Sequence, residues 1–238
     1  MTAGSVELVK PLYAPIVAHA ARRALVGRVR VKARPEDGRF TRRDVALLLS
    51  GAWSRYDQAV GSLRVQLTPG STMNVRLACF TFSFFEALLA EGTERTYAIE
   101  LIADASWQVY RVWARLASWA GHLKPGKATA LAFAVHKEGD NKGLVELRFP
   151  FNAPGYVIET VAAPAGTAFN VVHCPVAIYF RERGAADVCL SSWCNLDYAL
   201  SELTRQKLVR TQTLVEGAAF CDFRILPEPA GPTSLPET

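Results

Sequence analysis

The chain has 238 residues, of which 50% are hydrophobic and 21% charged, and its formal net charge is +5 at pH 7. This is the composition of a globular protein that is long enough for one large core or two small ones. The basic excess is mild and spread out, and its densest stretch, residues 22–34, interleaves valines with arginines. We therefore expect no nucleic-acid partner.

Targeting and membrane signals are not evident in the sequence. The N-terminal residues show no apolar core followed by a small-residue cleavage site, so we expect no signal peptide. The most apolar stretch, residues 77–90, contains Glu86 and is too short to span a bilayer, so it predicts a buried helix. The five cysteines are an odd number and lack the spacing of a disulfide framework. We therefore expect free thiols in a cytoplasmic protein that has no membrane partner.

The first half of the chain is predicted to be mainly helical. Residues 6–29 and 40–60 have helical patterns, and Thr41 with Asp44 forms a start that resembles a capping box. Residues 93–121 contain the longest helical pattern, and its apolar residues recur at helical spacing. This aromatic stripe indicates a core-facing helix rather than a cofactor slot.

The second half has a different pattern, in which strands alternate with helices. Residues 130–151 predict two strands around a turn, and the other predicted elements are strands at 168–174, 207–214 and 219–226 and helices at 175–190 and 193–206. The last two strands are expected to form a hairpin. The predicted fold class is therefore α+β, with a helical N-terminal half packed on a mostly antiparallel sheet that has helices in the C-terminal half.

The predicted domain organisation is a single α+β hydrolase-like domain over residues 1–226. Residues 1–122 are its mainly helical part and residues 128–226 its α+β part, which contains the motifs. Residues 227–238 are rich in proline and predict a disordered tail.

Common catalytic motifs are missing from the sequence, but thiols are concentrated near its end. There is no CxxC or HExxH zinc motif, no phosphate loop and no GxSxG elbow, so we expect neither a metal nor a cofactor. Four of the five cysteines follow residue 173, at Cys174, Cys189, Cys194 and Cys221. These thiols are the most informative candidates for chemistry.

Cys194 and Asp197 are three residues apart, which places them on one face of a helix. Asp197 could orient or deprotonate the thiol, or protonate a leaving group. A helix that begins near Ser191 or Ser192 would lower the pKa of Cys194 through its N-terminal dipole, whereas an ionised Asp197 would raise it. The alternative is that Cys194 is a small core side chain and Asp197 a solvated acid.

Cys221 and Asp222 are adjacent on a predicted strand, so their side chains point to opposite faces. Cys221 then shares a face with Phe223, and Asp222 shares one with Arg224. The alternative to a functional role is a core cysteine beside a surface ion pair.

His173 and Cys174 end a predicted strand immediately before Pro175, where a helix is expected to begin. A thiolate or a bound anion is favoured at such a place. The alternative is a buried thiol at a strand end.

Three runs of residues carry a family resemblance: HCPVAIYFRERG at 173–184, WCNLDYA at 193–199 and VRTQTLVEGAAFCDFRI at 209–225. They resemble the L-2-amino-thiazoline-4-carboxylic acid hydrolase family, and residues 82–105 look like its N-terminal half. The most specific pattern is the Arg-Thr-x-Thr-Leu, the glycine and the Cys-Asp-Phe-Arg of the last run. The resemblance implies a cysteine-dependent hydrolase that acts on a carbon–nitrogen bond, its type reaction being ring opening of a cyclic amidine to an N-carbamoyl amino acid.

On that basis the preferred catalytic residues are Cys194, Asp197 and Cys221. Cys194 would attack a C=N or carbonyl carbon and Asp197 would relay the proton, while Cys221 is either the nucleophile itself or a neighbour that tunes Cys194. Candidate substrate-binding residues are Arg224, Arg210, His173, Cys174 and Trp193. Each arginine could hold a substrate carboxylate or take part in a surface salt bridge.

Two weaker resemblances give an alternative function. The order of strand, HCP, helix, strand and Gly-x3-Cys-x-Phe is similar to the 4-vinyl-reductase domains, which bind small apolar ligands and in some cases zinc. Thr213 stands where those domains would supply a further cysteine, which argues against zinc here. The WCNLD stretch also resembles organomercurial lyases, over five residues. The alternative is thus a non-catalytic domain that binds a small apolar ligand. In either case the expected partner is a small molecule, and a homodimer is possible.

Overall fold

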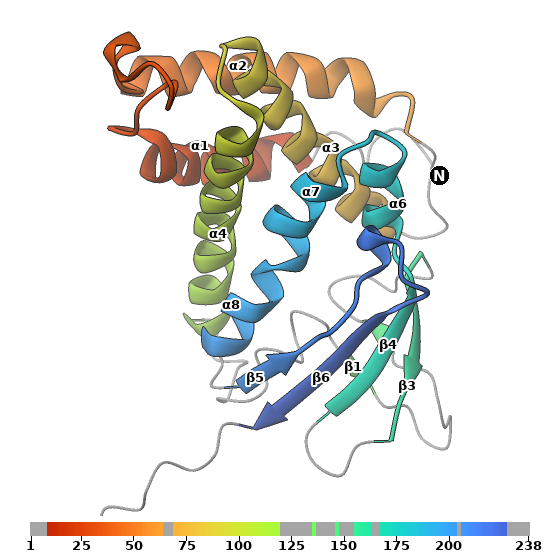
Figure 1. The fold of residues 1–238 in the computed structure, drawn as a ribbon. Coiled ribbons are helices and arrows are strands. Elements are labelled where there is room, and N and C mark those ends of the chain that lie inside the picture. The colour runs from red at the N-terminus through yellow and green to blue at the C-terminus, as the bar shows by residue number, and fades with distance from the viewer. Residues whose placement is uncertain are drawn as a thin grey trace, which may run out of the picture.

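Helices form the N-terminal half of the protein, and an antiparallel sheet with shorter helices forms the C-terminal half (Figure 1). This arrangement, seen in a computed structural model, confirms the predicted α+β class. The structure describes residues 9–63, 69–119, 135–136, 146–147, 155–162, 167–203 and 206–227. The predicted tail at 227–238 lies outside these residues from position 228 onward. The prediction of a single domain over residues 1–226 stays a prediction.

The helical half consists of α1 (Val9–Leu25), α2 (Arg42–Val60), α3 (Pro69–Ala90) and α4 (Arg95–Trp119). α1 packs on α4, and α2 packs on α3. The predicted capping box starts α2. The Asp44 N–H donates to Thr41 Oγ1 at 3.2 Å, and the Thr41 N–H donates to Asp44 Oδ2 at 2.8 Å. These two bonds satisfy backbone donors that a helix start leaves free, which fixes where α2 begins.

α3 is longer than its most apolar stretch suggested. It contains a 19-residue segment, Thr72–Ala90, that is long and apolar enough to cross a membrane by length and composition alone, so the expectation of a stretch too short to do so was wrong. Half of this segment is buried inside the structure, where Phe84, Phe85 and Leu88 are among the core side chains. A core helix passes the same length and composition test.

The main sheet has the strand order β3 (Val157–Thr160), β4 (Thr167–His173), β6 (Cys221–Pro227) and β5 (Gln206–Val209), and every pair in it is antiparallel. The predicted hairpin of the last two strands is confirmed as the β5–β6 pair. A second pair, β1 (Val135–His136) with β2 (Glu146–Leu147), lies within the two strands predicted at 130–151.

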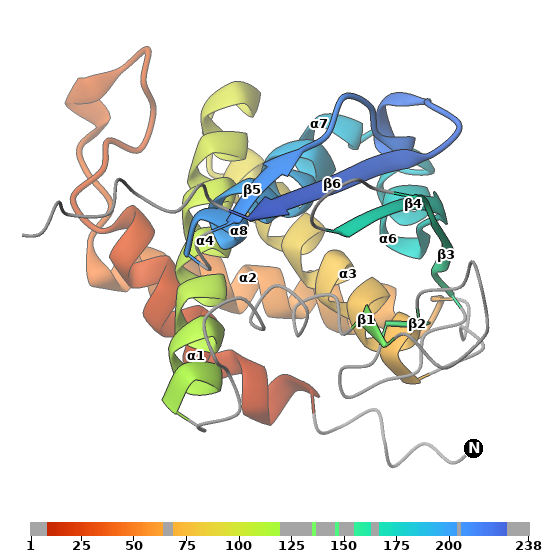
Figure 2. The same cartoon turned by 90° about the horizontal axis from the view of Figure 1, so that it is seen from below.

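Three shorter helices lie between α4 and the sheet or beside α3: α6 (Pro175–Arg181), α7 (Ala186–Cys189) and α8 (Leu196–Leu203) (Figures 1 and 2). The prediction of one helix over 175–190 was wrong, because the chain turns at Gly184. That residue has φ +62°, and the next N–H, of Ala185, closes the turn on the Phe180 carbonyl at 3.0 Å. A left-handed glycine at this place ends a helix without steric cost.

Between α7 and α8 the backbone forms a π-helical segment, η3 (Leu190–Cys194). The Asn195 N–H donates to the Leu190 carbonyl at 2.8 Å, which is a bond across five residues instead of four. The helix expected to begin near residue 193 is thus continuous with α7, and Cys194 does not lie in a first helical turn. Dipole stabilisation of a Cys194 thiolate, as considered from the sequence, therefore has no basis here.

The link between β5 and β6 is longer than the predicted hairpin loop. β5 ends at Val209 rather than at residue 214, because Thr213 caps a 3-10 turn, η4 (Leu214–Glu216), by accepting the Glu216 N–H at 3.3 Å. Gly217 follows with φ +96°. This link places Arg210 at the end of β5 and Leu214 against Cys221.

Buried apolar side chains form two groups. The helical cluster contains those of α1–α4, α6 and α7, such as Phe85, Leu101 and Phe180. The sheet cluster consists of Ile158, Phe169, Val171, Leu208, Cys221, Phe223 and Ile225. Tyr156, Cys174 and Leu214 pack against both clusters. The boundary between the clusters is where the cysteines of the C-terminal half meet.

Candidate active site

Arg210 joins two of the predicted catalytic residues. Its Nη1 donates to Oδ2 of Asp197 at 2.9 Å, and its Nη2 donates to the backbone carbonyl of Cys194 at 3.0 Å. The Arg210 and Asp197 side chains are only 2% and 14% exposed, so this is a buried ion pair. One planar guanidinium thereby fixes the end of the π-helical segment and the first turn of α8 relative to each other.

Aromatic rings surround the same guanidinium. Its carbon lies 5.1 Å from the ring centroid of Tyr198 and 5.3 Å from that of Phe223. The Tyr198 hydroxyl also donates to the Arg210 carbonyl at 2.9 Å. Arg210 is therefore held from α8, β6 and its own backbone, and neither role considered from the sequence, a substrate clamp or a surface salt bridge, describes its contacts.

The Asp197 carboxyl has an unusual environment for an acid. Burial raises its pKa to about 7, although the charge and hydrogen bond of Arg210 oppose this rise. Burial also disfavours the charge on Arg210, but the neighbouring Asp197 keeps the pKa of Arg210 above its usual value. A carboxyl whose pKa is raised in this way gains and loses a proton more readily near neutral pH than an ordinary aspartate.

The Cys194 thiol faces Cys189 instead of Asp197. The two Sγ atoms are 4.0 Å apart, and the Asp197 carboxylate is engaged by Arg210. Within the part of the chain that the structure describes, no hydrogen bond joins Cys194 Sγ to Asp197, so this expected contact is not found. The reason is the π-helical segment, whose wider turn brings residues five apart together.

The other thiols of the C-terminal half have structural contacts. The Cys174 sulfur caps α6 by accepting the Ala177 N–H at 3.4 Å, and the Cys221 sulfur accepts the Leu214 N–H at 3.2 Å. Burial raises the pKa of Cys174 to about 12 and that of Cys221 to about 11. The hydrogen bond with Cys194, together with burial, raises the pKa of Cys189 as well. These three thiols are therefore protonated at neutral pH.

Two tyrosines near the thiols were not singled out from the sequence as site residues. Burial raises the pKa of Tyr110 on α4 well above its usual value, and the neighbouring Asp197 and Cys194 add to this rise. Burial does the same to Tyr156, whose hydroxyl accepts from Asn74 Nδ2 at 3.3 Å. Tyr110 belongs to the aromatic stripe that indicated a core helix. Both phenols are protonated donors at neutral pH.

Arg224 does not pair with Asp222, as the shared strand face had suggested. Its guanidinium donates to the Phe169 carbonyl at 3.0 Å and to Asn170 Oδ1 at 3.1 Å. Asp222 instead accepts the N–H groups of Thr211 and Gln212, at 2.9 and 2.8 Å. The shared face of Cys221 and Phe223 is confirmed, because both side chains are buried in the sheet cluster.

His173 and Trp193, the remaining candidates, differ in their contacts. His173 ends β4, and its Nδ1 contacts the Gly155 carbonyl. The indole Nε1 of Trp193 is a buried donor that has no hydrogen-bond partner in the structure's described residues. Among these residues, neither side chain forms a hydrogen bond or an ion pair with Cys194 or Asp197.

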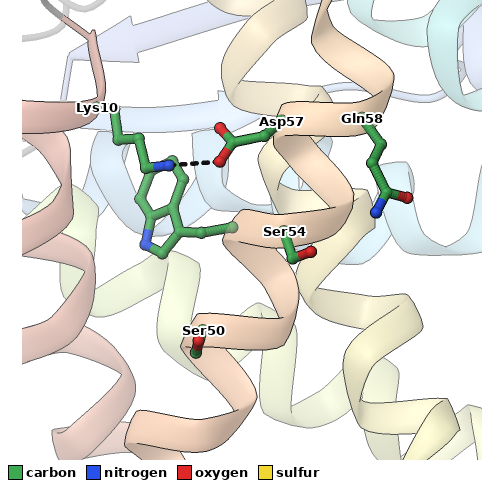
Figure 3. Close-up of a pocket in the computed structure, with 6 residues that line it drawn as sticks. Lys10, Ser50, Ser54, Asp57 and Gln58 are labelled. Atoms are coloured by element: carbon green, nitrogen blue, oxygen red, sulfur yellow. Dashed lines mark hydrogen bonds and ion pairs between the residues drawn. The ribbon is translucent and has the colours of Figure 1, made fainter.

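The thiols are separate from a pocket on the helical half. This pocket has a volume of about 580 Å³ and is lined by Lys10, Ser50, Trp53, Ser54, Asp57 and Gln58, with Lys10 paired to Asp57 at 2.6 Å (Figure 3). None of the candidate site residues lines it. In the described ranges, no group of three or more His, Cys, Asp or Glu side chains is placed to hold a metal ion.

Comparison with known families bears on these residues. Residues 129–225 match the model of the L-2-amino-thiazoline-4-carboxylic acid hydrolase family. The resemblance seen in the motifs is confirmed. The matched residues include every cysteine after position 173, together with Asp197 and Arg210, whereas the family-like stretch at 82–105 lies outside them. No curated protein and no solved structure matches the chain.

Proposed function

We propose that the protein is a cysteine-dependent hydrolase that acts at the C=N carbon of a small cyclic amidine or a related carbon–nitrogen compound. The match to the hydrolase family supports the reaction class. The observation that carries the proposal is Arg210, which binds the backbone of Cys194 and the carboxylate of Asp197 with one guanidinium. A nucleophile and a proton relay are thereby held on one rigid support.

Cys194 is the preferred nucleophile because of what the other thiols do. Cys174 and Cys221 accept backbone N–H groups, and Cys189 is only 1% exposed. Cys194 is partly exposed and has Cys189 as its thiol neighbour. A substrate can approach this partly exposed sulfur without displacing a hydrogen bond from a backbone N–H group.

The proposed reaction has two stages. The Cys194 sulfur adds to the amidine carbon, its proton passes through water to the Asp197 carboxylate, and the imine nitrogen takes up a proton from solvent, to which the later attack of water returns one. The protonated Asp197 then donates to the leaving ring heteroatom as the ring opens. Water attacks the covalent adduct and releases Cys194 as a thiol. A pKa of about 7 lets Asp197 act as base in the first stage and as acid in the second.

We further propose a cytoplasmic protein whose partner is its small-molecule substrate, without nucleic acid or membrane. A homodimer stays a prediction. The competing function is the ligand-binding domain of 4-vinyl-reductase type. The raised pKa values of Cys174, Cys189 and Cys221 favour it, because protonated buried thiols suit the lining of an apolar ligand site.

The test compares Cys194→Ser with Cys221→Ser and Asp197→Asn on a panel of cyclic amidines. Cys194→Ser should lose turnover, because serine is a far poorer nucleophile without a paired base. Asp197→Asn should slow turnover by about 10²–10⁴-fold, the usual effect of losing a general acid or base. Cys221→Ser should stay active, and thermal melts control for folding. Full activity in Cys194→Ser would remove this thiol from the mechanism, and an inactive wild type that binds an apolar ligand would favour the binding domain.

A further inference from the structure

Cys189 and Cys194 form a pair of neighbouring thiols that the hydrolytic mechanism does not use. Their Sγ atoms are 4.0 Å apart, and both belong to the short stretch from α7 through the π-helical segment. Cys194 is partly exposed, whereas Cys189 is buried behind it at 1% exposure. An exposed thiol backed by a buried one is the arrangement of an oxidisable cysteine beside its resolving partner.

We propose that a hydroperoxide oxidises Cys194 and that Cys189 then closes a reversible disulfide with it, which makes this pair a redox modification site. The disulfide itself needs the two thiols and the hydroperoxide, but no hydrolase activity. Its consequence, loss of hydrolase activity through consumption of the nucleophile, rests on the proposed function.

The chemistry balances in two steps. The Cys194 thiolate attacks one oxygen of the hydroperoxide, the O–O bond breaks, and the products are a Cys194 sulfenic acid and, after one proton is taken up, water or an alcohol. The Cys189 sulfur, losing its proton, then attacks the Cys194 sulfur and releases the sulfenic oxygen as a second water. The two sulfurs are oxidised by two electrons, and the peroxide is reduced by two. A thiol reductant reverses the result by exchange.

The geometry favours Cys189 over the other thiols as the resolving partner. A disulfide has an S–S length of about 2.05 Å, so the sulfurs must approach each other by roughly 2 Å, which rotation about the Cα–Cβ bonds provides. The backbone of this segment is held by the Asn195–Leu190 bond at 2.8 Å and the Arg210–Cys194 bond at 3.0 Å. By contrast, the Cys174 and Cys221 sulfurs accept backbone N–H groups.

The experiment treats the fully reduced protein with hydrogen peroxide or tert-butyl hydroperoxide at low molar excess. Five free thiols are present at the start, and the wild type should fall to three, with an intact mass lower by two hydrogens and a peptide map that links Cys189 to Cys194. Dithiothreitol should restore all five. Cys189→Ser should stop at a sulfenic acid on Cys194 that dimedone traps, whereas the matched control Cys174→Ser should form the disulfide like the wild type.

A second probe works on the wild type alone and covers the case in which Cys189→Ser does not fold. Phenylarsine oxide bridges two neighbouring thiols, so it should block two of the five thiols in the reduced protein. After oxidation it should block neither Cys189 nor Cys194. Five thiols remaining after peroxide, or a disulfide that joins other cysteines, would overturn the proposal.

Activity measurements separate the two hypotheses. A disulfide that forms in a protein without hydrolase activity keeps this inference and rejects the proposed function. An active enzyme that loses turnover in Cys194→Ser but forms no disulfide keeps the proposed function and rejects this inference. If both hold, peroxide should abolish turnover in the wild type and dithiothreitol should restore it in step with the thiol count.

Discussion

Replacing Arg210 by methionine should destabilise the protein more at pH 8 than at pH 5. Arg210 is the buried partner of Asp197, with its side chain 2% exposed and the carboxylate 14% exposed. Methionine keeps most of the length and apolar contact of the side chain between Tyr198 and Phe223 but removes the charge and both hydrogen bonds. The variant therefore isolates the polar contribution of the guanidinium.

The magnitude depends on the protonation of Asp197. At pH 8 the wild-type carboxyl is ionised, because its pKa is about 7. Removal of Arg210 raises that pKa further, so the carboxyl takes up a proton, and at pH 8 this adds at most about 1.4 kcal/mol, the equivalent of one pH unit, to the loss of the hydrogen bonds. At pH 5 Asp197 is protonated in both proteins, so the loss reduces to the hydrogen bonds to Asp197 and to the Cys194 carbonyl, about 1 kcal/mol each.

The assay is urea unfolding of the wild type and Arg210→Met at pH 5 and pH 8, with Arg95→Met as the matched control. Arg95 pairs with Asp187 at 2.7 Å, but these side chains are 46% and 48% exposed. Slight burial opposes ionisation of Asp187, yet hydrogen bonds from Arg95 and the Val188 N–H hold its pKa below the usual value. The control should therefore cost no more than about 1 kcal/mol, equally at both pH values.

Two outcomes would refute this reasoning. One is an equal loss of stability at pH 5 and pH 8 in Arg210→Met, which would mean that the ionisation of Asp197 does not govern the cost. The other is a loss at pH 8 no larger than that of Arg95→Met, which would mean that the Arg210–Asp197 pair is solvated. In either case the rigid support assumed for Cys194 and Asp197 would lose its basis.

Three further predictions concern stability. The folded pKa of Asp197 lies above the usual value near 3.9, so the protein is most stable with respect to this carboxyl below pH 4. That stability, at most about 4 kcal/mol, is lost as the pH rises through 7. Urea midpoints measured from pH 4 to 8 should show this slope in the wild type and not in Asp197→Asn. Gly184→Ala should cost about 1–2 kcal/mol in thermal melts because φ is +62°, whereas Gly61→Ala, at φ −67°, should not destabilise. Phe223→Ala should cost about 3–5 kcal/mol, since its ring stacks on Phe169 at 4.9 Å in the sheet cluster, while truncation of the exposed Leu226 should cost little.

Local signals explain which parts of the fold were predictable. The start of α2 follows from Thr41 and Asp44, because a capping box depends on four neighbouring residues. The face shared by Cys221 and Phe223 follows from the period of two in a strand. The break at Gly184 was visible in the sequence as a glycine, but its left-handed φ depends on where α7 packs.

The candidate site was harder to predict because its geometry depends on longer-range contacts. The i, i+3 spacing of Cys194 and Asp197 predicts one helix face only if the helix is regular, and a π-helical segment leaves no local signal in these residues. The Arg210–Asp197 pair joins the residue that follows β5 to a residue of α8, so only the fold brings them together. The pattern of apolar residues alone predicts that charged side chains such as Arg210 and Asp197 are exposed, whereas both are buried in this pair.

The division of the interior into a helical and a sheet cluster has a consequence for access to the buried thiols. Each cluster keeps its own apolar packing, so a sub-global opening that parts them at Cys174 and Leu214 leaves both folded. Such an opening uncovers the thiols from the inside of the molecule, because Cys194 packs on one cluster and Cys221 belongs to the other. We expect the Leu214 amide, which is bonded to the Cys221 sulfur, to exchange hydrogen faster than the amides at the centres of α4 and β6. The frequency of that opening would then limit how often a small molecule reaches the buried Cys221 thiol.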